Sequence, residues 1–441
     1  MESRIVAPAR GPEPAEESGR RLWGGEQKTA RCLERAEPAI EPDQAGVWHV
    51  RAFKEARAIL RSSAVRQAGF KAEVLALLPR LMRLPLLYSD GQEHQQQRRQ
   101  TARFFAPRVV NEQYRKLMEA VSEQLIEKLL RRRRIDLSRL TLEMAVRVAA
   151  EVVGLTDSWL PGMARRLEAF FRYPIQRLSP DPRTWLNFLG LQWAILRFYW
   201  LDVRPAIRVR RRQPRQDVIS HLLAQGYSAR EILTECVTYG AAGMITTREF
   251  IGVAAWHLLE QPALRQRFLQ APEEERLALL EEVLRLEPVV GHLYRRTSQE
   301  LILAGAGEDQ LRIPAGAIID LHIYAINADE RVVGEQARRL CPGRTLHEER
   351  VPSSLMGFGD GAHRCPGAPI AMQESDIFLR RLLALPGLRL ERSPRLRWNK
   401  LICGYELRDL IVSLDESGSR PHAAGPALGV ASPTAAALGE P

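Results

Sequence analysis

The hydrophobic and polar positions of this chain follow a helical period over most of its length and a strand period in a few short segments. After Gly46, the pattern VWHVRAF followed by KEARAILRS predicts a short strand and then a helix. Asp136 is followed by LSRLTLEMAVRVAAEVVGL, which has the spacing of an amphipathic helix. Residues 301–323 predict strands separated by turns, with IPAG as one turn. These patterns indicate a mainly α fold with small β-sheets.

The longest helical pattern begins at Ser228, where Ser228 and Glu231 have the spacing of a capping box. It continues to Glu260 and stops before Pro262, because the residue that precedes a proline disfavours helical geometry. At about 30 residues, this helix is much longer than the average helix of a globular protein. We therefore expect a central helix that crosses the molecule.

The two ends of the chain differ in composition from the rest. Residues 1–20 are rich in Pro, Glu, Gly and Arg, and residues 416–441 are of low complexity, so we predict that both segments are disordered. The length of 441 residues alone would suggest about three domains. The motifs described below run from residue 94 to residue 365 without a linker, which instead predicts a single large domain over residues 21–415.

The chain is basic, with 64 Lys and Arg against 53 Asp and Glu and a formal net charge of +11. Its basic residues cluster at 131–134 and 208–215. Such runs can bind nucleic acid or an acidic partner, but they more often form solvated helix ends and loops. Neither a helix-turn-helix nor an RNA-stacking motif is evident, which argues against a nucleic-acid binder.

Five cysteines are spread along the chain, namely Cys32, Cys236, Cys341, Cys365 and Cys403. Their number is odd, their spacing is wide and no CxxC pair occurs, so neither a disulfide framework nor a zinc site fits them. The first twenty residues lack the apolar core of a signal peptide, and charged residues interrupt the most apolar stretches. We therefore expect a soluble cytoplasmic protein without a membrane span.

One cysteine lies in a glycine-rich segment, FGDGAHRCPG, at residues 358–367. Gly359, Gly361 and Gly367 lack a Cβ, so the backbone can turn sharply and approach a flat group closely. A helical pattern resumes directly afterwards, which places Cys365 before a helix N-terminus, where the dipole and the free N–H groups favour a thiolate. A lone thiolate in such a loop suits an axial ligand of haem iron. The alternative is a buried, inert cysteine in a glycine turn.

This segment resembles the haem-binding signature of the cytochrome P450 family, FGxGxHxCxG, at every fixed position. The resemblance implies a haem b cofactor, with Cys365 as the iron ligand and a catalytic residue, and with the other matched residues around the cofactor. Because no N-terminal anchor is evident, the chain is most similar to soluble bacterial members of the family. The matched residues are Phe358, Gly359, Gly361, His363, Cys365 and Gly367.

Two motifs elsewhere in the chain match haem-propionate sites of the family. His94 and Arg98 lie at i and i+4 on one helix face, so both can reach the same anion, and in the family this HxxxR spacing binds a propionate. Arg295 matches the propionate-binding arginine that precedes a short β-sheet, with Arg296 as the alternative.

A structural motif of the family, the ExxR pair, is matched by Glu282 and Arg285. At i and i+3, the two side chains face the same way and can form a buried, charge-assisted pair. The resemblance implies that this pair holds the core beneath the haem. Either Arg338 or Arg339 is expected to join it as a third partner.

The middle of the predicted central helix, AAGMITT, resembles the oxygen-binding kink of the family. Ala242 and Gly243 leave room over the iron, and the hydroxyl of Thr246, a second catalytic residue, can interrupt the helix hydrogen bonds and hold a water or dioxygen molecule. The chain departs from the family at Ile245, where an acid that helps to carry protons is usual. Glu249 could replace that acid, or it could simply pair with the arginine beside it.

The resemblance also indicates where a substrate would bind. Residues 65–87 match a mobile loop that lines the cavity, and ordinary core packing explains them equally well. Residues 170–203 are rich in aromatic side chains and match the lid over the entrance, although helix packing is favoured for most of them. Candidate substrate contacts are Tyr239, Ile245, His292 and Leu293.

The function implied by the resemblance is a monooxygenase of secondary metabolism. Such an enzyme inserts one oxygen atom from O2 into a C–H bond of an apolar natural product or lipid-like molecule. Ferredoxin and ferredoxin reductase would supply the electrons, and an acidic ferredoxin suits a basic surface. We expect a monomer. Ile245 favours a second hypothesis, namely oxidative coupling or peroxide-driven or substrate-assisted oxidation. A haem sensor without turnover is a third hypothesis, against which Thr246 argues.

Overall fold

The computed structural model describes residues 28–29, 38–69, 83–172, 182–304, 310–348, 350–400 and 402–415. The two ends predicted to be disordered, residues 1–20 and 416–441, lie outside the described residues, as do residues 70–82 of the predicted cavity loop. Among the helices that are described, none is both long enough and apolar enough to cross a membrane.

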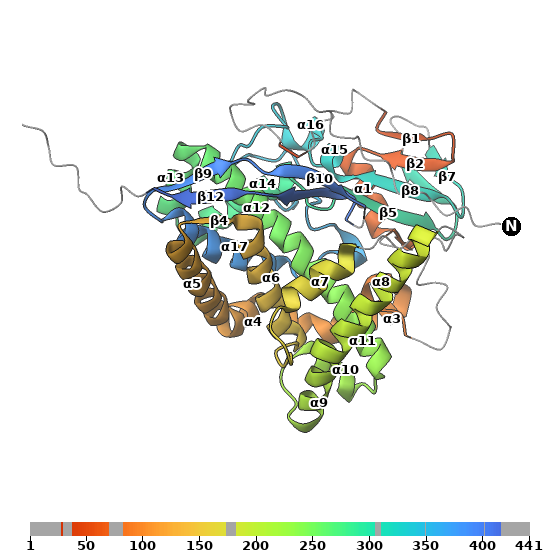
Figure 1. The fold of residues 1–441 in the computed structure, drawn as a ribbon. Coiled ribbons are helices and arrows are strands. Elements are labelled where there is room, and N and C mark those ends of the chain that lie inside the picture. The colour runs from red at the N-terminus through yellow and green to blue at the C-terminus, as the bar shows by residue number, and fades with distance from the viewer. Residues whose placement is uncertain are drawn as a thin grey trace, which may run out of the picture.

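Helices make up most of the described molecule, and the largest sheet lies at the upper right of Figure 1 with the helices α3 to α11 below it. The predicted fold class, mainly α with small β-sheets, is confirmed. The helices are α1 (Phe53–Arg61), α3 (Gly91–Ala102), α4 (Pro107–Val109), α5 (Arg115–Arg132), α6 (Leu137–Val153), α7 (Met163–Arg172), α8 (Pro182–Phe198), α9 (Arg204–Arg212), α10 (Val218–Ala224), α11 (Ala229–Tyr239), α12 (Thr246–Glu260), α13 (Pro262–Gln270), α14 (Glu273–Leu286), α15 (Ile323–Ile326), α16 (Glu330–Val333) and α17 (Ala368–Leu383).

Short segments of other helical geometry join several of these helices. Three are π-helical and lie within continuous helical runs: η3 (Val110–Tyr114), η4 (Tyr199–Val203) and η5 (Gly240–Ile245). Three are single 3₁₀ turns: η1 (Leu86–Tyr88), η2 (Arg103–Phe105) and η6 (Gly361–His363).

The largest sheet has five strands in the order β1 (Ile40–Pro42), β2 (Val47–Val50), β8 (Ile318–His322), β5 (His292–Thr297) and β3 (Val65–Ala68). Strands β2 and β8 run parallel, and the other neighbours run antiparallel. The smaller sheets pair β4 (Arg134–Asp136), β12 (Ile411–Leu414) and β9 (Leu388–Arg392), then β6 (Leu301–Ala304) with β7 (Gln310–Ile313), and β10 (Arg395–Asn399) with β11 (Gly404–Arg408).

The predicted central helix is present as α11, η5 and α12 in one continuous run. Ser228 and Glu231 form the predicted capping box at its start, and α12 ends at Glu260, just before Pro262 begins α13. Almost every residue of α12 is buried, because the helix packs against α6 and α17 inside the main hydrophobic cluster. The helix therefore crosses the core, as its length predicts.

Two further local predictions are confirmed. The strand and helix after Gly46 are β2 and α1, and Asp136 caps α6 by accepting a hydrogen bond from the backbone N–H of Ser138. After the last helix, α17, four strands follow, β9 to β12. Two of them pair with each other, and the other two join β4.

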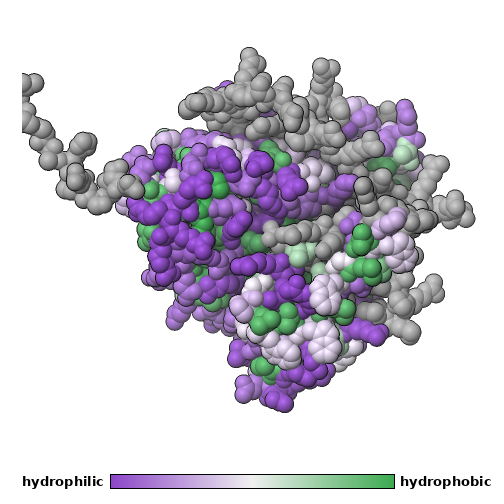
Figure 2. Space-filling view, viewed as in Figure 1, coloured by the Kyte–Doolittle hydropathy of each residue, from purple (hydrophilic) through white to green (hydrophobic). Residues whose placement is uncertain are grey.

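The aromatic-rich segment has a more exposed surface than its composition predicts. White and green side chains gather over α8 and η4 at the lower right of Figure 2. Phe198 is buried, whereas four other aromatic residues of the segment are exposed. They are Trp185, Phe188, Trp193 and Trp200.

Candidate active site around Cys365

The glycine-rich loop at residues 358–367 packs against the end of α1 and leads into α17. Gly359 and Gly361 have φ angles of +68° and +67°, a left-handed conformation that favours glycine. A Cβ on Gly361 would lie 2.0 Å from the carbonyl oxygen of Leu60, so only glycine lets the loop approach α1 this closely. The N–H of Cys365 donates to the carbonyl oxygen of Phe358 at 2.8 Å and closes the loop.

The Cys365 side chain is accessible, yet it lies deep enough for burial to raise the pKa of its thiol. An accessible group at such depth faces a space inside the fold. Backbone N–H groups of Gly367 and Ala368, at the start of α17, oppose this rise, as does the charge of Arg98. Because burial outweighs them, the expected preference for a thiolate is wrong for the protein alone. A metal ion would displace the proton, since the thiolate is the form that binds metals.

Helix α3 brings two of the predicted residues to this loop. His94 is buried, and its ring stacks on His363 with the ring centroids 4.2 Å apart. Burial lowers the pKa of His94 to about 4, and the charges of His363 and Arg98 act in the same direction. His363 Nε2 lies 3.1 Å from the carboxylate of Asp90. Arg98 donates to the carbonyl oxygen of the residue before Cys365, which brings its positive charge close to the thiol.

Arg295 lies on β5 and is only 4% exposed. Its Nη1 donates to the carbonyl oxygen of Tyr294 at 2.8 Å, and its other N–H groups bond to no described residue. No carboxylate among the described residues forms an ion pair with it, and burial lowers the pKa of the guanidinium to about 10. Arg296, its neighbour on β5, instead donates to the carbonyl oxygen of Gly316 at 3.1 Å. A buried arginine with so few acceptors fits an anion that the described protein does not supply.

The central helix is interrupted where the sequence predicts it. The π-helical turn η5 lies between α11 and α12, and Ala242 within it is exposed although the surrounding helix is buried. Gly243 faces Ala149, and a Cβ added to Gly243 would lie 3.9 Å from the Cβ of Ala149. The hydroxyl of Thr246 donates to the carbonyl oxygen of Ala242. Such π-turns often occur at functional sites, and this one exposes small residues inside the fold.

Glu249 does not replace the acid that the family usually carries on this helix. Ile245, at the usual position of the acid, is buried in the core. The carboxylate of Glu249 accepts hydrogen bonds from Arg248 at 2.7 Å, from Arg408 at 3.0 Å and from the backbone N–H of Leu407 at 2.7 Å. The structure thus shows the pairing of Glu249 with its neighbouring arginine, and it argues against a proton relay through Glu249.

Two buried acids near the central helix were missed by the motif analysis. Burial raises the pKa of Glu235 on α11 to about 7 and that of Glu374 on α17 to about 8. Glu235 lines a small pocket with Tyr239 and Gln97, and its Oε2 has no hydrogen-bond partner among the described residues. The sequence signal was weak, since each acid is a single polar residue in an amphipathic helix.

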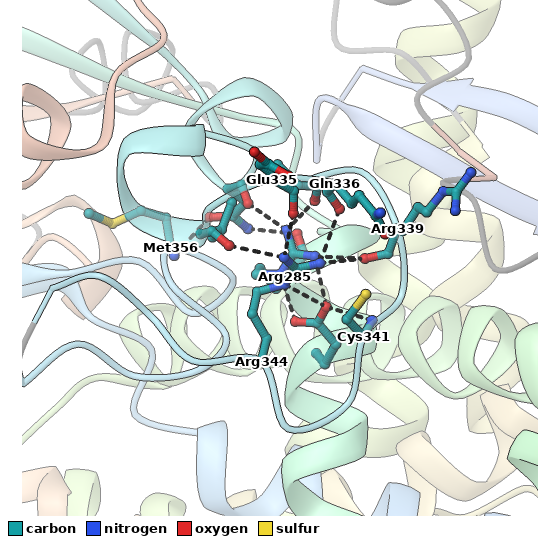
Figure 3. Close-up of polar contacts among 11 residues, drawn as sticks. Arg285, Glu335, Gln336, Arg339, Cys341, Arg344 and Met356 are labelled. Carbon is teal, nitrogen blue, oxygen red and sulfur yellow. Dashed lines mark hydrogen bonds and ion pairs between the residues drawn. The ribbon is translucent and has the colours of Figure 1, made fainter.

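Beneath the loop, Glu282 and Arg285 of α14 form a buried ion pair with distances of 2.7 and 2.8 Å. Arg285 also donates to carbonyl oxygens of Asn327, Ala337 and Arg339, as Figure 3 shows. The expected third partner was wrong: Arg344, not Arg338 or Arg339, reaches Glu282, with Nε 3.4 Å from Oε1. Arg339 contributes only its backbone, since its carbonyl oxygen accepts from both arginines.

The four predicted substrate contacts take different positions. Leu293 lies beside the cysteine loop: a Cβ added to Gly359 would lie 3.8 Å from the Cδ1 of Leu293. Tyr239 stacks on Phe105 with the ring centroids 6.0 Å apart, and Ile245 is buried. His292 alternates with Leu293 along β5 and therefore projects from the opposite face of the sheet, which argues against a substrate contact.

The residues gathered here fit a haem. The accessible thiol of Cys365 can bind the iron, and the unneutralised donors of Arg295, Arg98 and His94 suit the two propionates of an iron porphyrin. Small residues of η5 leave room for a flat group or a small ligand.

Comparison with known families agrees with this geometry. A model of the family described as Cytochrome P450 matches residues 277–385, which contain the Glu282–Arg285 pair and the cysteine loop. Mycinamicin IV hydroxylase/epoxidase from Micromonospora griseorubida is 25% identical over 391 residues, covering 85% of this chain and 91% of the relative. The C-19 steroid 1alpha-hydroxylase of Sorangium cellulosum is 26% identical over 310 residues, covering 68% and 73%.

Solved structures show the same fold. CalO2 has a TM-score of 0.70 at 22% identity, covering 86% of this chain and 94% of that one. A mutant of P450 EryK in complex with erythromycin B has a TM-score of 0.68 at 22% identity, covering 87% and 94%.

Proposed function

Because this chain is a bacterial-type member of the cytochrome P450 family, a family of oxygen-incorporating oxidoreductases, we propose that it is a monooxygenase acting on an apolar small molecule. The proposed reaction inserts one oxygen atom from O2 into a C–H bond, with electrons from a ferredoxin and its reductase. The observation that carries this proposal is the accessible Cys365 thiol with Arg98 beside it, together with the buried and unneutralised Arg295 on β5.

The proposed cofactor is haem b, within one domain that spans residues 21–415. Cys365 would hold the iron, while Arg295, Arg98 and His94 would donate hydrogen bonds to the propionates. When bound, haem supplies the activation of dioxygen, and the thiolate ligand favours O–O cleavage. The further residues proposed to line the cofactor are Phe358, Gly359, His363, Gly367, Ala242 and Gly243.

The chain's own residues prepare the site for this chemistry. The π-turn leaves the Thr246 hydroxyl bonded to the carbonyl oxygen of Ala242, where it can hold a water molecule and pass on a proton. Leu293 and Ile245 present apolar surface on β5 and on the central helix. Apolar walls of this kind favour a hydrophobic substrate and exclude bulk water.

The substrate class is proposed to be a natural product or a lipid-like molecule. The support comes from the relatives, since one is named as a hydroxylase/epoxidase of mycinamicin IV and another as a steroid hydroxylase. The exposed aromatic residues of α8 give the predicted lid a large apolar surface. We place the protein in the secondary metabolism of the cytoplasm, and its four described cysteines are free, as a reducing compartment favours.

The proposed electron donor is an acidic ferredoxin, which would bind a monomer of this protein. The net charge of +11 favours such an encounter. Arg61, whose side chain is 52% exposed, lies beside the cysteine loop through its ion pair with Asp360. A positive approach to the loop would orient an acidic partner toward the cofactor.

A second candidate function is favoured by one observation. Ile245 stands where the family usually has an acid, and the carboxylate of Glu249 already accepts hydrogen bonds from two arginines. Oxidative coupling, or peroxide-driven or substrate-assisted oxidation, would not need that acid. Peroxide-driven oxidation differs from the monooxygenase reaction in the source of the inserted oxygen and in needing no external electrons, and oxidative coupling differs in inserting no oxygen.

The test uses purified haem-loaded protein and a pool of apolar natural products. We would compare reactions fed by NAD(P)H, a surrogate ferredoxin and its reductase under ¹⁸O₂ with reactions fed by hydrogen peroxide alone. The monooxygenase proposal predicts products that carry ¹⁸O only in the electron-fed reaction. Products formed with peroxide alone, or coupled products without inserted oxygen, would overturn it in favour of the second function.

A further inference from the structure

The face of the large sheet opposite Arg295 carries a cluster of histidines around one carboxylate. His49 on β2 is the register partner of Asp320 on β8, and His292 on β5 is the partner of His322. Since side chains alternate along a strand, Asp320 and His322 project from the same face of β8. Three neighbouring strands, β2, β8 and β5 in Figure 1, therefore direct these polar groups to one point.

Three ligand atoms in this cluster lie unusually close together. His49 Nδ1 is 2.8 Å from His322 Nε2 and 3.5 Å from Asp320 Oδ2, and His322 Nε2 is 3.4 Å from the same oxygen. Asp320 is 1% exposed, while the side chains of His49 and His322 are 21% and 11% exposed. The carboxylate is thus buried, and the two imidazoles leave a route for a small ion.

These distances match the spacing of metal ligands. A point equidistant from the three atoms lies about 1.9 Å from each, which is slightly less than the 2.0–2.1 Å of a Zn–N bond. An ion placed just off the plane of the three atoms would therefore reach all of them at bonding distance. The distances that involve Asp320 already suit tetrahedral ligands, and only the two histidine nitrogens would need to separate by about half an ångström.

Further polar groups support the ligand atoms from behind. His292 Nδ1 lies 2.9 Å from Asp320 Oδ1, the carboxylate oxygen that is turned away from the other histidines. His49 Nε2 lies 3.4 Å from Asp43 Oδ2, which leaves Nδ1 as the nitrogen available for a metal. Carboxylates that fix the ring orientation of metal-binding histidines are a regular feature of metal sites.

We propose that His49 Nδ1, His322 Nε2 and Asp320 Oδ2 bind a divalent first-row transition-metal ion, with Zn²⁺ as the best match. Two imidazoles and one carboxylate form a nitrogen and oxygen ligand set that suits such ions, and a water molecule would complete the tetrahedron. The site uses no cysteine and is separate from the proposed haem, so it does not depend on the proposed function.

The ion would join two distant parts of the chain. His49 lies near the start of the described sheet, whereas Asp320 and His322 lie almost 300 residues later on the parallel strand. Their neighbour β5 carries Leu293 and Arg295 on its other face, toward the cysteine loop. The site would therefore stabilise the sheet that positions the proposed propionate-binding arginine.

The test measures zinc uptake by full-length, haem-loaded protein without a polyhistidine tag. After treatment with a chelator, the protein is dialysed against ZnCl₂ and its bound metals are counted by mass spectrometry. We expect one zinc per chain in addition to the haem iron, and a higher melting temperature when zinc is present. His49→Asn and His322→Asn should each weaken zinc binding more than about 100-fold, and His292→Asn about 10- to 100-fold.

His347→Asn is the matched control, because His347 is an exposed histidine on another surface, and this variant should bind zinc like the parent protein. Zinc X-ray absorption of the parent protein, which needs no variant, should show two imidazole ligands. Failure of the folded parent protein to bind zinc at tenfold excess would overturn the proposal. Undiminished binding by folded His49→Asn protein would do the same.

Discussion

Two buried arginines on neighbouring elements of this protein have opposite surroundings. Arg285 is bound to the carboxylate of Glu282 and to three backbone carbonyl oxygens, so its charge is neutralised within the chain. Arg295 is almost as deeply buried, but among the described residues its side chain bonds only to the carbonyl oxygen of Tyr294. Burial disfavours a charge unless it is paired. A complete hydrogen-bond network around a buried arginine therefore indicates a structural role, whereas an incomplete network indicates a missing ligand.

The largest effect is expected when the complete network is broken. Arg285→Met should lower the free energy of unfolding by about 3–5 kcal/mol, because it leaves the Glu282 carboxylate buried without its main partner. Chemical denaturation of the protein with and without haem measures this loss. Arg338→Met is the control, since Arg338 forms no ion pair with Glu282, and it should change stability little. Equal losses in the two variants would contradict the account.

Removing the arginine of the incomplete network should change the free energy of unfolding in the opposite direction. Arg295→Met removes an unpaired buried charge, so the haem-free protein should be as stable as the parent or more stable. Haem affinity should fall by about 10- to 150-fold, which corresponds to the loss of about 1.5–3 kcal/mol from a charged hydrogen bond. Haem transfer to apomyoglobin measures the affinity.

Arg296→Met is the matched control for this prediction. Arg296 is the next residue on β5, so it projects from the opposite face of the sheet, and it donates to the backbone carbonyl oxygen of Gly316. It should leave haem affinity unchanged. If Arg296→Met weakened haem binding while Arg295→Met did not, the propionate-binding residue would be the other arginine.

Glu235 offers a smaller effect, which depends on pH. Its pKa is raised to about 7 in the folded protein, so the folded state holds the proton more tightly than the unfolded state. The resulting stability is present below about pH 4.5 and is lost as the pH rises through about 7. Glu235→Gln cannot ionise, and its stability relative to the parent should therefore rise by up to about 3 kcal/mol between pH 5 and pH 8.

Thermal or chemical unfolding at several pH values measures this trend. Glu374→Gln provides a comparison, because the pKa of Glu374 is raised to about 8 and the trend should move to higher pH. A stability difference that stays constant from pH 5 to pH 8 for Glu235→Gln would contradict the burial of an uncompensated acid at this position.

The smallest effect is expected from a substitution in the central helix. Ile245→Asp restores an acid at the position where the family usually has one, and we expect more organic product per hydrogen peroxide formed. Glu249→Gln should leave this ratio nearly unchanged, because Glu249 is held by Arg248 and Arg408. An unchanged ratio in Ile245→Asp would show that this position carries few protons in this protein.

The sequence predicted those parts of the site that depend on local order. The long helix with its capping box, the cysteine loop and the spacing of Glu282 and Arg285 are set by residues close together in the chain, and the structure contains all of them. The third partner of that pair was missed because Arg344 reaches Glu282 through a long loop, in which its position depends on backbone carbonyl oxygens.

Features that depend on tertiary burial were not predictable. The raised pKa of the Cys365 thiol is opposite to the expectation from its helix terminus, since burial outweighs the local N–H groups. The histidine cluster around Asp320 forms only when three strands align, and no single segment contains its ligand pattern. The choice between Arg295 and Arg296 required the direction of each side chain on β5.

The proposed binding of haem iron by Cys365, beside the unneutralised arginines, is tested by the absorption spectrum of the reduced protein with carbon monoxide. We expect a thiolate-type spectrum for the parent protein and also for Cys341→Ser, because the backbone N–H of Cys341 donates to Glu282 and places this residue in the Glu282 network. Cys365→Ser should lose that spectrum. A thiolate-type spectrum that persisted in Cys365→Ser would show that another residue binds the iron and would contradict the account.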